Sequence, residues 1–192
     1  CAIMGEPTSM QPAIAEKGLM VLDCIASGVS GHAARNEGVN AIYNAISDIE
    51  WFRNHKFPKT SQLLGDVKMT VTQVNAGTQH NVIPDECRFV IDIRTTDAYT
   101  NEETARIVNE LLTSDAKERS TRVHASAIYE DHPLVKATIA CGRETFVSPT
   151  TSDMALMHGI PSLKMGGGQS SRSHGADEFV LESEIVEGIQ TY

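Results

Sequence analysis

Three side chains of this sequence could do metal or acid–base chemistry, and each lies in or beside a turn. Glu6 follows a short apolar run, His32 lies between two glycines, and His174 follows a glycine-rich loop. Carboxylate oxygens and neutral imidazole nitrogens are common zinc ligands, and imidazole also moves protons near neutral pH. Each residue could equally be an exposed turn side chain, because one such residue without a partner is a weak signal.

The most informative stretch surrounds His32. Residues 28–42 read G-V-S-G-H-A-A-R-N-E-G-V-N-A-I and present one histidine and one arginine, Arg35, between glycines. A β-rich run (18–26) precedes them, and apolar residues at helical spacing follow. Glycines permit the positive φ angles of a tight strand-to-helix turn. Two interpretations stay open: a solvated loop before a helix, or an imidazole offered to a site that this segment does not itself contain.

Motifs of several common enzyme classes do not occur in the sequence. It contains no G-x-S-x-G nucleophile elbow, no H-E-x-x-H zinc helix, no P-loop and no dinucleotide glycine fingerprint. The three glycines at 166–168 could cradle an anion with their amides, but a triple glycine is more often a flexible turn. His55, His124 and His158 have no such context, and we interpret them as structural or exposed.

Composition and charge describe an ordinary globular protein. The 192 residues are 41% apolar and 21% charged, which excludes collagen-like and disordered chains. The net charge of -9 argues against a nucleic-acid partner, and no apolar run approaches the roughly 18 residues of a membrane span. Four widely spaced cysteines without a C-x-x-C pair predict reduced, mostly buried thiols in a cytoplasmic protein. Because the sequence begins at Cys1 and ends within an apparent helix, we expect a fragment of a longer protein.

Hydrophobic periodicity predicts a compact unit over residues 18–128. Its order is strand (19–27), helix (39–54), strand (67–75), strand (86–94), helix (101–117) and strand (120–128). The inward positions of the strand at 86–94 are Cys87, Phe89, Ile91 and Ile93. Thr100 and Glu103 form a capping box at the start of the second helix. This β-α-β-β-α-β order predicts a ferredoxin-like α+β domain, with both helices on one face of a four-stranded sheet.

The flanking segments alternate helix and strand instead. Residues 1–5 read as a buried strand, and Pro133 suits the first position of a helix. After it, the pattern predicts a helix (134–141), a short helix (154–158), a strand (161–165) and a final helix (181–192). We therefore predict an α/β domain that is split into residues 1–17 and 129–192, with the ferredoxin-like unit at 18–128 inserted between its halves.

The stretch around His32 resembles a family signature. G-x-x-G-H-A-A-R-x-x-x-G-x-N-A-I is similar to the lid-domain signature of the dinuclear zinc amidohydrolases and peptidases that include acetylornithine deacetylase and succinyl-diaminopimelate desuccinylase. G-E-P-T at 5–8 also matches, and four later stretches match in the family's order: N-x-x-P-D at 81–85, D-I-R at 92–94, T-S-D at 151–153 and H-x-x-D-E at 174–178. The resemblance covers nearly the whole chain. It implies a split zinc-peptidase-like catalytic domain with an inserted dimerisation and lid domain.

The resemblance implies roles for Glu6, His32 and His174. Glu6 and His174 would each hold one of two metals, and they flank the inserted domain in sequence, as the two halves of one site should. His32 matches the lid histidine that reaches the partner subunit's site, where it would be the catalytic donor to the developing oxyanion. Two zinc ions per active site are implied, and cobalt could replace them.

Three further residues match substrate contacts of the family. Asn81 would contact substrate, although it must also serve the turn between two strands. Arg94 matches the arginine that pairs with the substrate's α-carboxylate, and a surface ion pair with a nearby carboxylate is the alternative. Thr151 would line the acyl site, but Thr150 replaces the family's glycine, so the loop could be shaped differently.

Several family residues have no counterpart in the sequence. The pattern also requires an H-x-D histidine, a bridging aspartate and a Glu-Glu pair that supplies the general base and a ligand. All of these lie upstream of G-E-P-T, and only five residues precede Glu6. We therefore expect the chain alone to be inactive and not to bind zinc tightly.

The activity implied for the intact protein is zinc-dependent hydrolysis of the amide bond of a small-molecule N-acyl amino acid, by a cytoplasmic homodimer that pairs through its lid domains. Overall likeness favours the acetylornithine deacetylase branch, which acts in arginine biosynthesis. Succinyl-diaminopimelate desuccinylase, N-acetylcitrulline deacetylase and dipeptidase activities remain alternatives. A further hypothesis is that this chain alone is a non-catalytic dimerisation module, because a ferredoxin-like sheet leaves an edge strand that another copy can extend.

Overall fold

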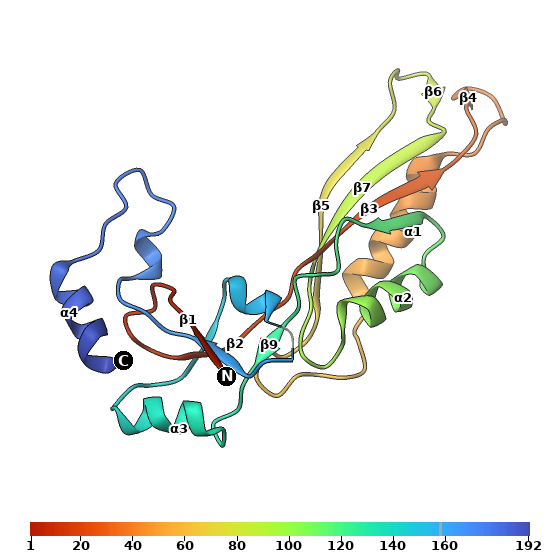
Figure 1. Ribbon diagram of the computed structural model, residues 1–192. Helices are drawn as coiled ribbons and strands as arrows, with labels where there is room; N and C mark the ends of the chain where they lie inside the picture. Colours follow the sequence, from red (N-terminus) through yellow and green to blue (C-terminus); the bar gives the residue numbers. More distant parts are fainter. Residues whose placement is uncertain (158) are drawn as a thin grey trace.

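Two larger sheets organise the chain, and two adjacent segments connect them (Figure 1). This computed structural model describes residues 1–157 and 159–192, so the prediction made for His158 lies outside the described residues. One sheet is built from the middle of the chain, and the other from residues toward both ends. In the described part of the chain, no helix is long and apolar enough to cross a membrane.

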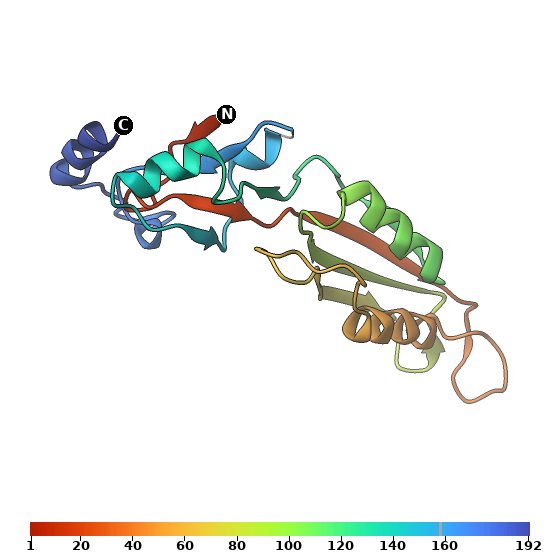
Figure 2. The same cartoon turned by 90° about the horizontal axis from the view of Figure 1, so that it is seen from below.

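We call the first sheet the antiparallel sheet. Its strands, in spatial order, are β5 (Lys68–Ala76), β7 (Glu86–Arg94), β3 (Met20–Ser27) and β8 (Asp115–Glu118). Each neighbouring pair is antiparallel. Helices α1 (Ala41–Asn54) and α2 (Asn101–Leu111) cover the same face (Figure 2). The predicted ferredoxin-like arrangement is therefore confirmed.

Alternation along the two central strands places the core of this unit under its helices. The four predicted inward residues of β7 (Cys87, Phe89, Ile91 and Ile93) are at most 1% exposed. They share one cluster with alternate residues of β3 and with apolar residues of both helices, including Phe52 of α1 and Val108 of α2. Helix α2 starts with the predicted capping box, because Thr100 and Glu103 exchange hydrogen bonds between side chain and backbone. Local pattern and tertiary packing agree here.

The end of the antiparallel unit differs from the prediction. The pattern predicts a longer second helix and a strand over 120–128, whereas α2 ends at Leu111 and β8 follows almost at once. Asp48 of α1 explains the early end of the helix. Its buried carboxylate accepts hydrogen bonds from the backbone N–H groups of Thr113 and Ser114, at 3.1 and 2.8 Å. A residue far away in the sequence thus decides where β8 begins.

We call the second sheet the mixed sheet. Its strands, in spatial order, are β1 (Ala2–Met4), β11 (Ser162–Lys164), β2 (Ala13–Glu16) and β10 (Phe146–Ser148), and β9 (Ser126–Ala127) also pairs with β2. The remaining elements are α3 (Pro133–Ala140), α4 (Glu182–Thr191) and the 3-10 helices η1 (Asp153–Leu156) and η2 (Ser170–Arg172). The split α/β architecture is confirmed, since the two ends of the chain share one sheet. The divisions at residues 17 and 128 stay predictions.

The two connecting segments lie side by side at Gly18. Gly18 N donates to the Thr95 carbonyl at 3.1 Å, and a Cβ at this position would lie 2.6 Å from Ala125 N. Only glycine allows the segments to approach this closely. Asn101, 1% exposed, donates its side-chain amide to the carbonyl of Val123 at 2.9 Å, which ties the returning segment to α2.

A short ribbon extends the antiparallel sheet at its end farthest from the mixed sheet (Figure 1). It consists of β4 (Gly31–His32) and β6 (Val82–Ile83), which pair antiparallel. We call this ribbon, with its bordering loops 33–38 and 77–81, the tip. The glycine-punctuated stretch around His32 therefore leads into the tip before Asn40 caps α1 by accepting a hydrogen bond from Ile42 N.

Candidate functional site

One pocket of about 380 Å³ lies on the mixed sheet. Glu6, which follows β1, and His174, which follows η2, both line it. Thr151 lines the same pocket, and its Oγ1 donates a hydrogen bond to the Lys17 carbonyl at 3.1 Å. The lone pairs of this hydroxyl oxygen are not used in that bond. The structure thus brings two predicted metal ligands and one predicted acyl contact to a single cavity.

Gly166 makes this meeting of the chain ends possible. A Cβ on Gly166 would lie 2.7 Å from the Glu6 carbonyl oxygen and 3.2 Å from Glu6 N, so a side chain would push the two segments apart. The contact is held by two hydrogen bonds: Thr8 N donates to the Gly166 carbonyl at 3.1 Å, and Gly166 N donates to Thr8 Oγ1 at 3.2 Å. The first glycine of the triple therefore has a packing role that the sequence alone does not reveal.

Residues with strained backbone angles lie at or next to the pocket. The three non-glycine residues that the described chain holds at positive φ are Ser9 (54°), Met10 (56°) and His174 (61°). Such angles are uncommon outside glycine and persist only where surrounding contacts impose them. Ser9 lines the pocket together with His174, and the Ser9 and Met10 amides are tied to carbonyls of the glycine loop at 2.7 and 2.9 Å. Strain at these positions is typical of functional sites.

The loop that carries His174 is anchored to α4. Arg172 forms an ion pair with Glu184 at 2.7 Å, and its guanidinium lies 4.6 Å from the centre of the Phe179 ring. His174 N donates to Glu178 Oε2 at 3.3 Å. The hydrogen bond from the Leu181 amide, and after it the one from Arg172, hold the pKa of the Glu184 carboxyl below its usual value and favour its charged form.

Glu6 and His174 are chemically suitable zinc ligands, but two ligands are too few for a zinc site. A carboxylate and an imidazole are ordinary zinc ligands, and a zinc site uses three or four protein ligands. Among residues 1–157 and 159–192, no three His, Cys, Asp or Glu side chains lie close enough together to hold a metal ion. Glu6 and His174 could therefore complete a metal centre, and they do not form one by themselves.

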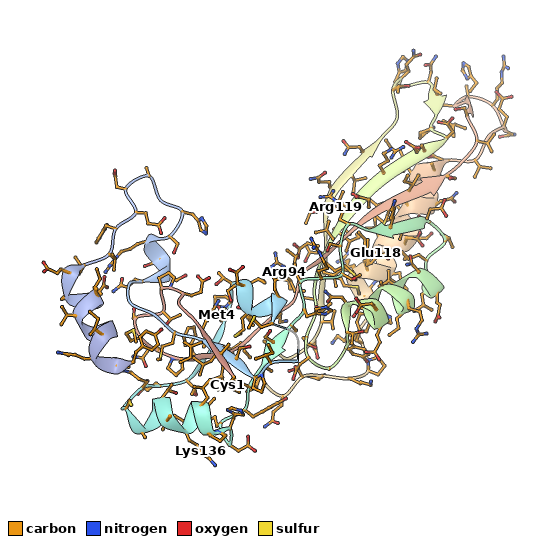
Figure 3. All side chains as sticks on the ribbon, viewed as in Figure 1. Cys1, Met4, Arg94, Glu118, Arg119 and Lys136 are labelled. Atoms are coloured by element: carbon orange, nitrogen blue, oxygen red, sulfur yellow. The ribbon has the colours of Figure 1, made fainter. Side chains whose placement is uncertain are left out.

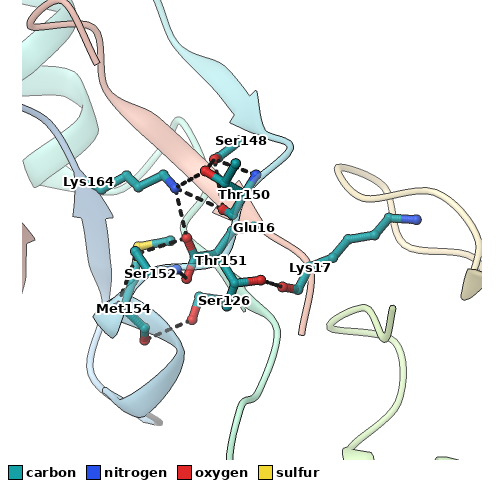
Figure 4. Close-up of polar contacts among 9 residues, drawn as sticks. All are labelled: Glu16, Lys17, Ser126, Ser148, Thr150, Thr151, Ser152, Met154 and Lys164. Carbon is teal, nitrogen blue, oxygen red and sulfur yellow. Dashed lines mark hydrogen bonds and ion pairs between the residues drawn. The ribbon is translucent and has the colours of Figure 1, made fainter. Parts of the chain in front are cut away.

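A buried ion pair includes Lys164, which lines the pocket, and Figure 4 shows its contacts. Lys164 Nζ of β11 lies 3.1 Å from Glu16 Oε2 of β2, and the two side chains are 4% and 0% exposed. Lys164 Nζ also donates to the carbonyl and hydroxyl oxygens of Thr150, at 2.9 and 3.2 Å. Glu16 accepts from the amide and hydroxyl of Ser152, at 3.1 and 2.9 Å. This network shapes the loop that presents Thr151.

Glu16 and Lys164 belong to the site although their sequence context did not predict it. Each is a charged residue within an apolar run, P-A-I-A-E and P-S-L-K-M, and a buried strand with a charge needs a partner for it. That signal indicates burial, but it does not indicate which residue the partner is. Thr150, the departure from the family's glycine, has a use here because two of its oxygens bind Lys164.

His32 and Asn81 meet at the tip rather than at the pocket. His32 pairs with Val82 across the ribbon, and the Asn81 carbonyl accepts from Ala33 N at 3.0 Å. His32 Nδ1 accepts from Ala34 N at 3.1 Å, which assigns the proton of the neutral ring to Nε2. Nε2–H is therefore a donor on an exposed side chain, at the far end of the molecule from β1 (Figure 1).

Arg94 ends β7 where the antiparallel sheet approaches the mixed sheet (Figure 3). It forms a bidentate ion pair with Asp92, with Nε and Nη2 at 2.7 and 3.0 Å from the two carboxylate oxygens. Arg94 does not line the pocket that holds Glu6 and His174. In the folded chain Arg94 therefore forms the ion pair with a nearby carboxylate that was the alternative to substrate binding. Its contact with a substrate carboxylate stays a prediction.

Comparison with protein families gives one match. The model described as the peptidase dimerisation domain (M20) matches residues 14–120, which include the whole antiparallel sheet and the tip.

Curated relatives include acetylornithine deacetylases from several bacteria. That of Edwardsiella ictaluri is 28% identical over 204 residues, covering 97% of this chain and 53% of the relative. That of Erwinia tasmaniensis is 27% identical, covering 94% of this chain and 52% of the relative. The chain therefore spans about half the length of the curated relatives it matches.

Two solved structures have a similar fold at low identity. The aminopeptidase PepT from Bacillus cereus superimposes with a TM-score of 0.72 at 18% identity, covering 99% of this chain and 54% of that one. The YXEP protein of Bacillus subtilis, described as a dinuclear metal binding peptidase from the M20 family, gives a TM-score of 0.58 at 18% identity, covering 96% and 52%.

Proposed function

The chain belongs to the peptidase dimerisation domain family (M20), and we propose that it is the part of a zinc-dependent amidohydrolase that carries the lid and one half of the metal site. The observation that carries the proposal is that Glu6 and His174, near the two ends of the chain, line one pocket. The strained backbone at His174 supports a functional role for this loop.

In this proposal Glu6 and His174 each bind one metal, and the other ligands and the general base come from residues outside these 192. The number of ligands within the described residues supports this division of the site. When bound, two metal ions would supply an activated water and polarise the scissile carbonyl. The chain's own residues hold the acyl group at Thr151 and keep the two ligand loops in contact through Gly166.

His32 is proposed to act in the pocket of a second copy. The tip lies at the far end of the molecule from β1, so a His32 that takes part in catalysis has to serve another chain's site (Figure 1). Its Nε2–H is the kind of donor that stabilises a developing oxyanion, and Asn81 at the same tip would contact the substrate. Arg94 would exchange Asp92 for the substrate's α-carboxylate.

A homodimer through the antiparallel sheet is part of the proposal. Among the described residues, strand β5 lies at the edge of its sheet and pairs only with β7. On neighbouring α1, Tyr43 and Ile46 are 70% and 45% exposed, and such apolar side chains favour an interface. Two copies paired edge to edge would continue the sheet and align their α1 helices. A cytoplasmic location accompanies this proposal, since all four cysteines are free thiols.

The proposed substrate is an N-acyl amino acid. N-acetylornithine is the first candidate, because relatives named acetylornithine deacetylase match most of the chain. The test is to compare this chain with one extended by its upstream coding sequence. We expect the extended protein to hold two zinc ions and hydrolyse N-acetylornithine, and the 192-residue chain to do neither. An extended protein that contains zinc but cleaves no N-acyl amino acid or dipeptide would overturn the proposal.

The isolated chain has a second candidate function, as a dimerisation module without catalysis. The specific observation in its favour is the family match, which covers the antiparallel sheet rather than the pocket. Light scattering with metal analysis decides: a metal-free dimer supports the module for this chain, and two bound zinc ions per chain contradict it.

A further inference from the structure

We propose that Glu16 neutralises Lys164 in the wall of the Glu6–His174 pocket, and that this ion pair restricts the acyl group of the substrate to uncharged ones. The inference rests on the proposed function, because it assumes that the acyl group lies against Thr151. It separates acetyl-type from succinyl-type substrates, which the resemblance left open.

The charges of the wall support this assignment. Of the described residues that line the pocket, Lys164 is the one lysine or arginine. Glu6 contributes a negative charge, and most other lining side chains bear hydroxyl groups or are apolar. A carboxylate at the end of an acyl chain would lose its water on entering such a pocket, and a free cation in the wall would offset much of that loss. Whether Lys164 is free thus decides which acyl groups bind.

The Lys164 ammonium group already has three acceptors within the chain, one for each of its N–H groups. An ammonium group has three N–H donors, and its three acceptors are Glu16 Oε2, the Thr150 carbonyl and the Thr150 hydroxyl, at 3.1, 2.9 and 3.2 Å. Its side chain is only 4% exposed, although the residue borders the pocket. A ligand carboxylate would have to displace Glu16, which is 0% exposed.

Glu16 cannot turn away to release the lysine. Both of its oxygens accept hydrogen bonds from Ser152, at 3.1 Å from the amide and 2.9 Å from the hydroxyl. Moving the carboxylate would leave these donors and the lysine without partners inside the protein, which is costly. The pair therefore presents a neutral wall of hydroxyl groups, suited to a small acyl group such as acetyl or formyl.

The test uses the 192-residue chain and two ligands, N-acetylglycine and N-succinylglycine, with binding followed by NMR titration at mildly alkaline pH, where exposed imidazoles are neutral. Glu16→Gln keeps the shape of the side chain and frees the charge of Lys164. We expect this variant to raise the affinity for N-succinylglycine about tenfold relative to that for N-acetylglycine, in line with one charge-assisted hydrogen bond. An unchanged affinity for N-succinylglycine would overturn the inference.

The matched control is the double variant Glu16→Gln/Lys164→Met, which removes both charges and leaves no unpaired ion. We expect it to bind N-succinylglycine as the wild type does. A wild type that binds this ligand tenfold more tightly than the double variant would overturn the inference, even if Glu16→Gln alone fails to fold. None of these measurements needs turnover. If the extended protein fails to hydrolyse its substrates, that result counts against the proposed function alone. If the wild-type chain binds N-succinylglycine tenfold more tightly than the double variant, that result counts against the neutralised ion pair alone.

Discussion

Gly166 packs directly on the backbone of Glu6, so that any side chain at position 166 would fall 2.7 Å from the Glu6 carbonyl oxygen. This contact joins the start of the chain to the loop that leads to His174. The meeting of the two predicted metal ligands thus depends on a residue with no side chain.

Gly166→Ala should destabilise the fold and separate the two ligand loops. Overpacking against backbone atoms typically costs about 1–3 kcal/mol. We expect a lower urea midpoint, together with shifted NMR signals of Glu6 and His174. Gly5→Ala is the matched control, because a Cβ there meets nothing within 4 Å. Equal stability of Gly166→Ala and Gly5→Ala would mean that the close approach is not required.

His32→Ala should depress turnover far more than substrate binding. In the protein extended upstream, losing one oxyanion donor is expected to lower kcat on the order of a hundredfold, with little change in KM. Steady-state kinetics with N-acetylornithine measure both constants. Near-normal kcat in this variant would remove His32 from the mechanism.

Mixing two inactive variants should restore activity if His32 acts on a second copy. In the protein extended upstream, a chain with His32→Ala keeps Glu6, and a chain with Glu6→Ala supplies His32, so one site of each mixed dimer is complete. Refolding the two variants together is expected to give activity that neither has alone. Absence of restored activity, with mixed dimers present by mass spectrometry, would place His32 outside the partner's site.

The double variant Tyr43→Lys/Ile46→Lys should make the chain monomeric without unfolding it. Both side chains are exposed on α1, so charges there oppose pairing but disturb little within the chain. Light scattering and circular dichroism test the two statements. Ile139→Lys, at another exposed apolar position on α3, is the control and should leave the dimer intact. A dimer that survives in the double variant would exclude this face of α1.

Ionisation of the buried Cys24 thiol should lower the stability of the folded protein at alkaline pH. Burial, with smaller contributions from Asp48 and Asp23, raises the pKa of its thiol from 9.0 to about 12. The folded state therefore favours the protonated thiol. Its contribution is complete below the unfolded pKa of 9.0 and declines as the pH rises towards 12. Urea midpoints measured across this range should fall, and Cys24→Ala should remove part of the fall.

Thiol labelling gives an independent check on the same group. The sequence-based expectation of mostly buried cysteines holds for Cys24 and Cys87, whereas Cys1 and Cys141 are exposed. A maleimide reagent should modify the two exposed thiols in the native protein and the two buried ones only after unfolding. Rapid native labelling of Cys24 would contradict both its burial and its raised pKa.

The sequence by itself determined the ferredoxin-like order and the burial of alternate β7 residues, because strand and helix periods and capping are local properties of the chain. It also indicated the tip histidine and the two ligand candidates through their motifs. It failed where a distant contact outweighs local pattern, as Asp48 does at the end of α2.

Only the tertiary structure decided that Glu6 and His174 share a pocket, that Arg94 is paired with Asp92, and that Glu16 and Lys164 neutralise each other. The physical reason is the same in each case. A charge or a close backbone contact is satisfied by whichever group the fold brings near it, and that group can lie anywhere in the sequence.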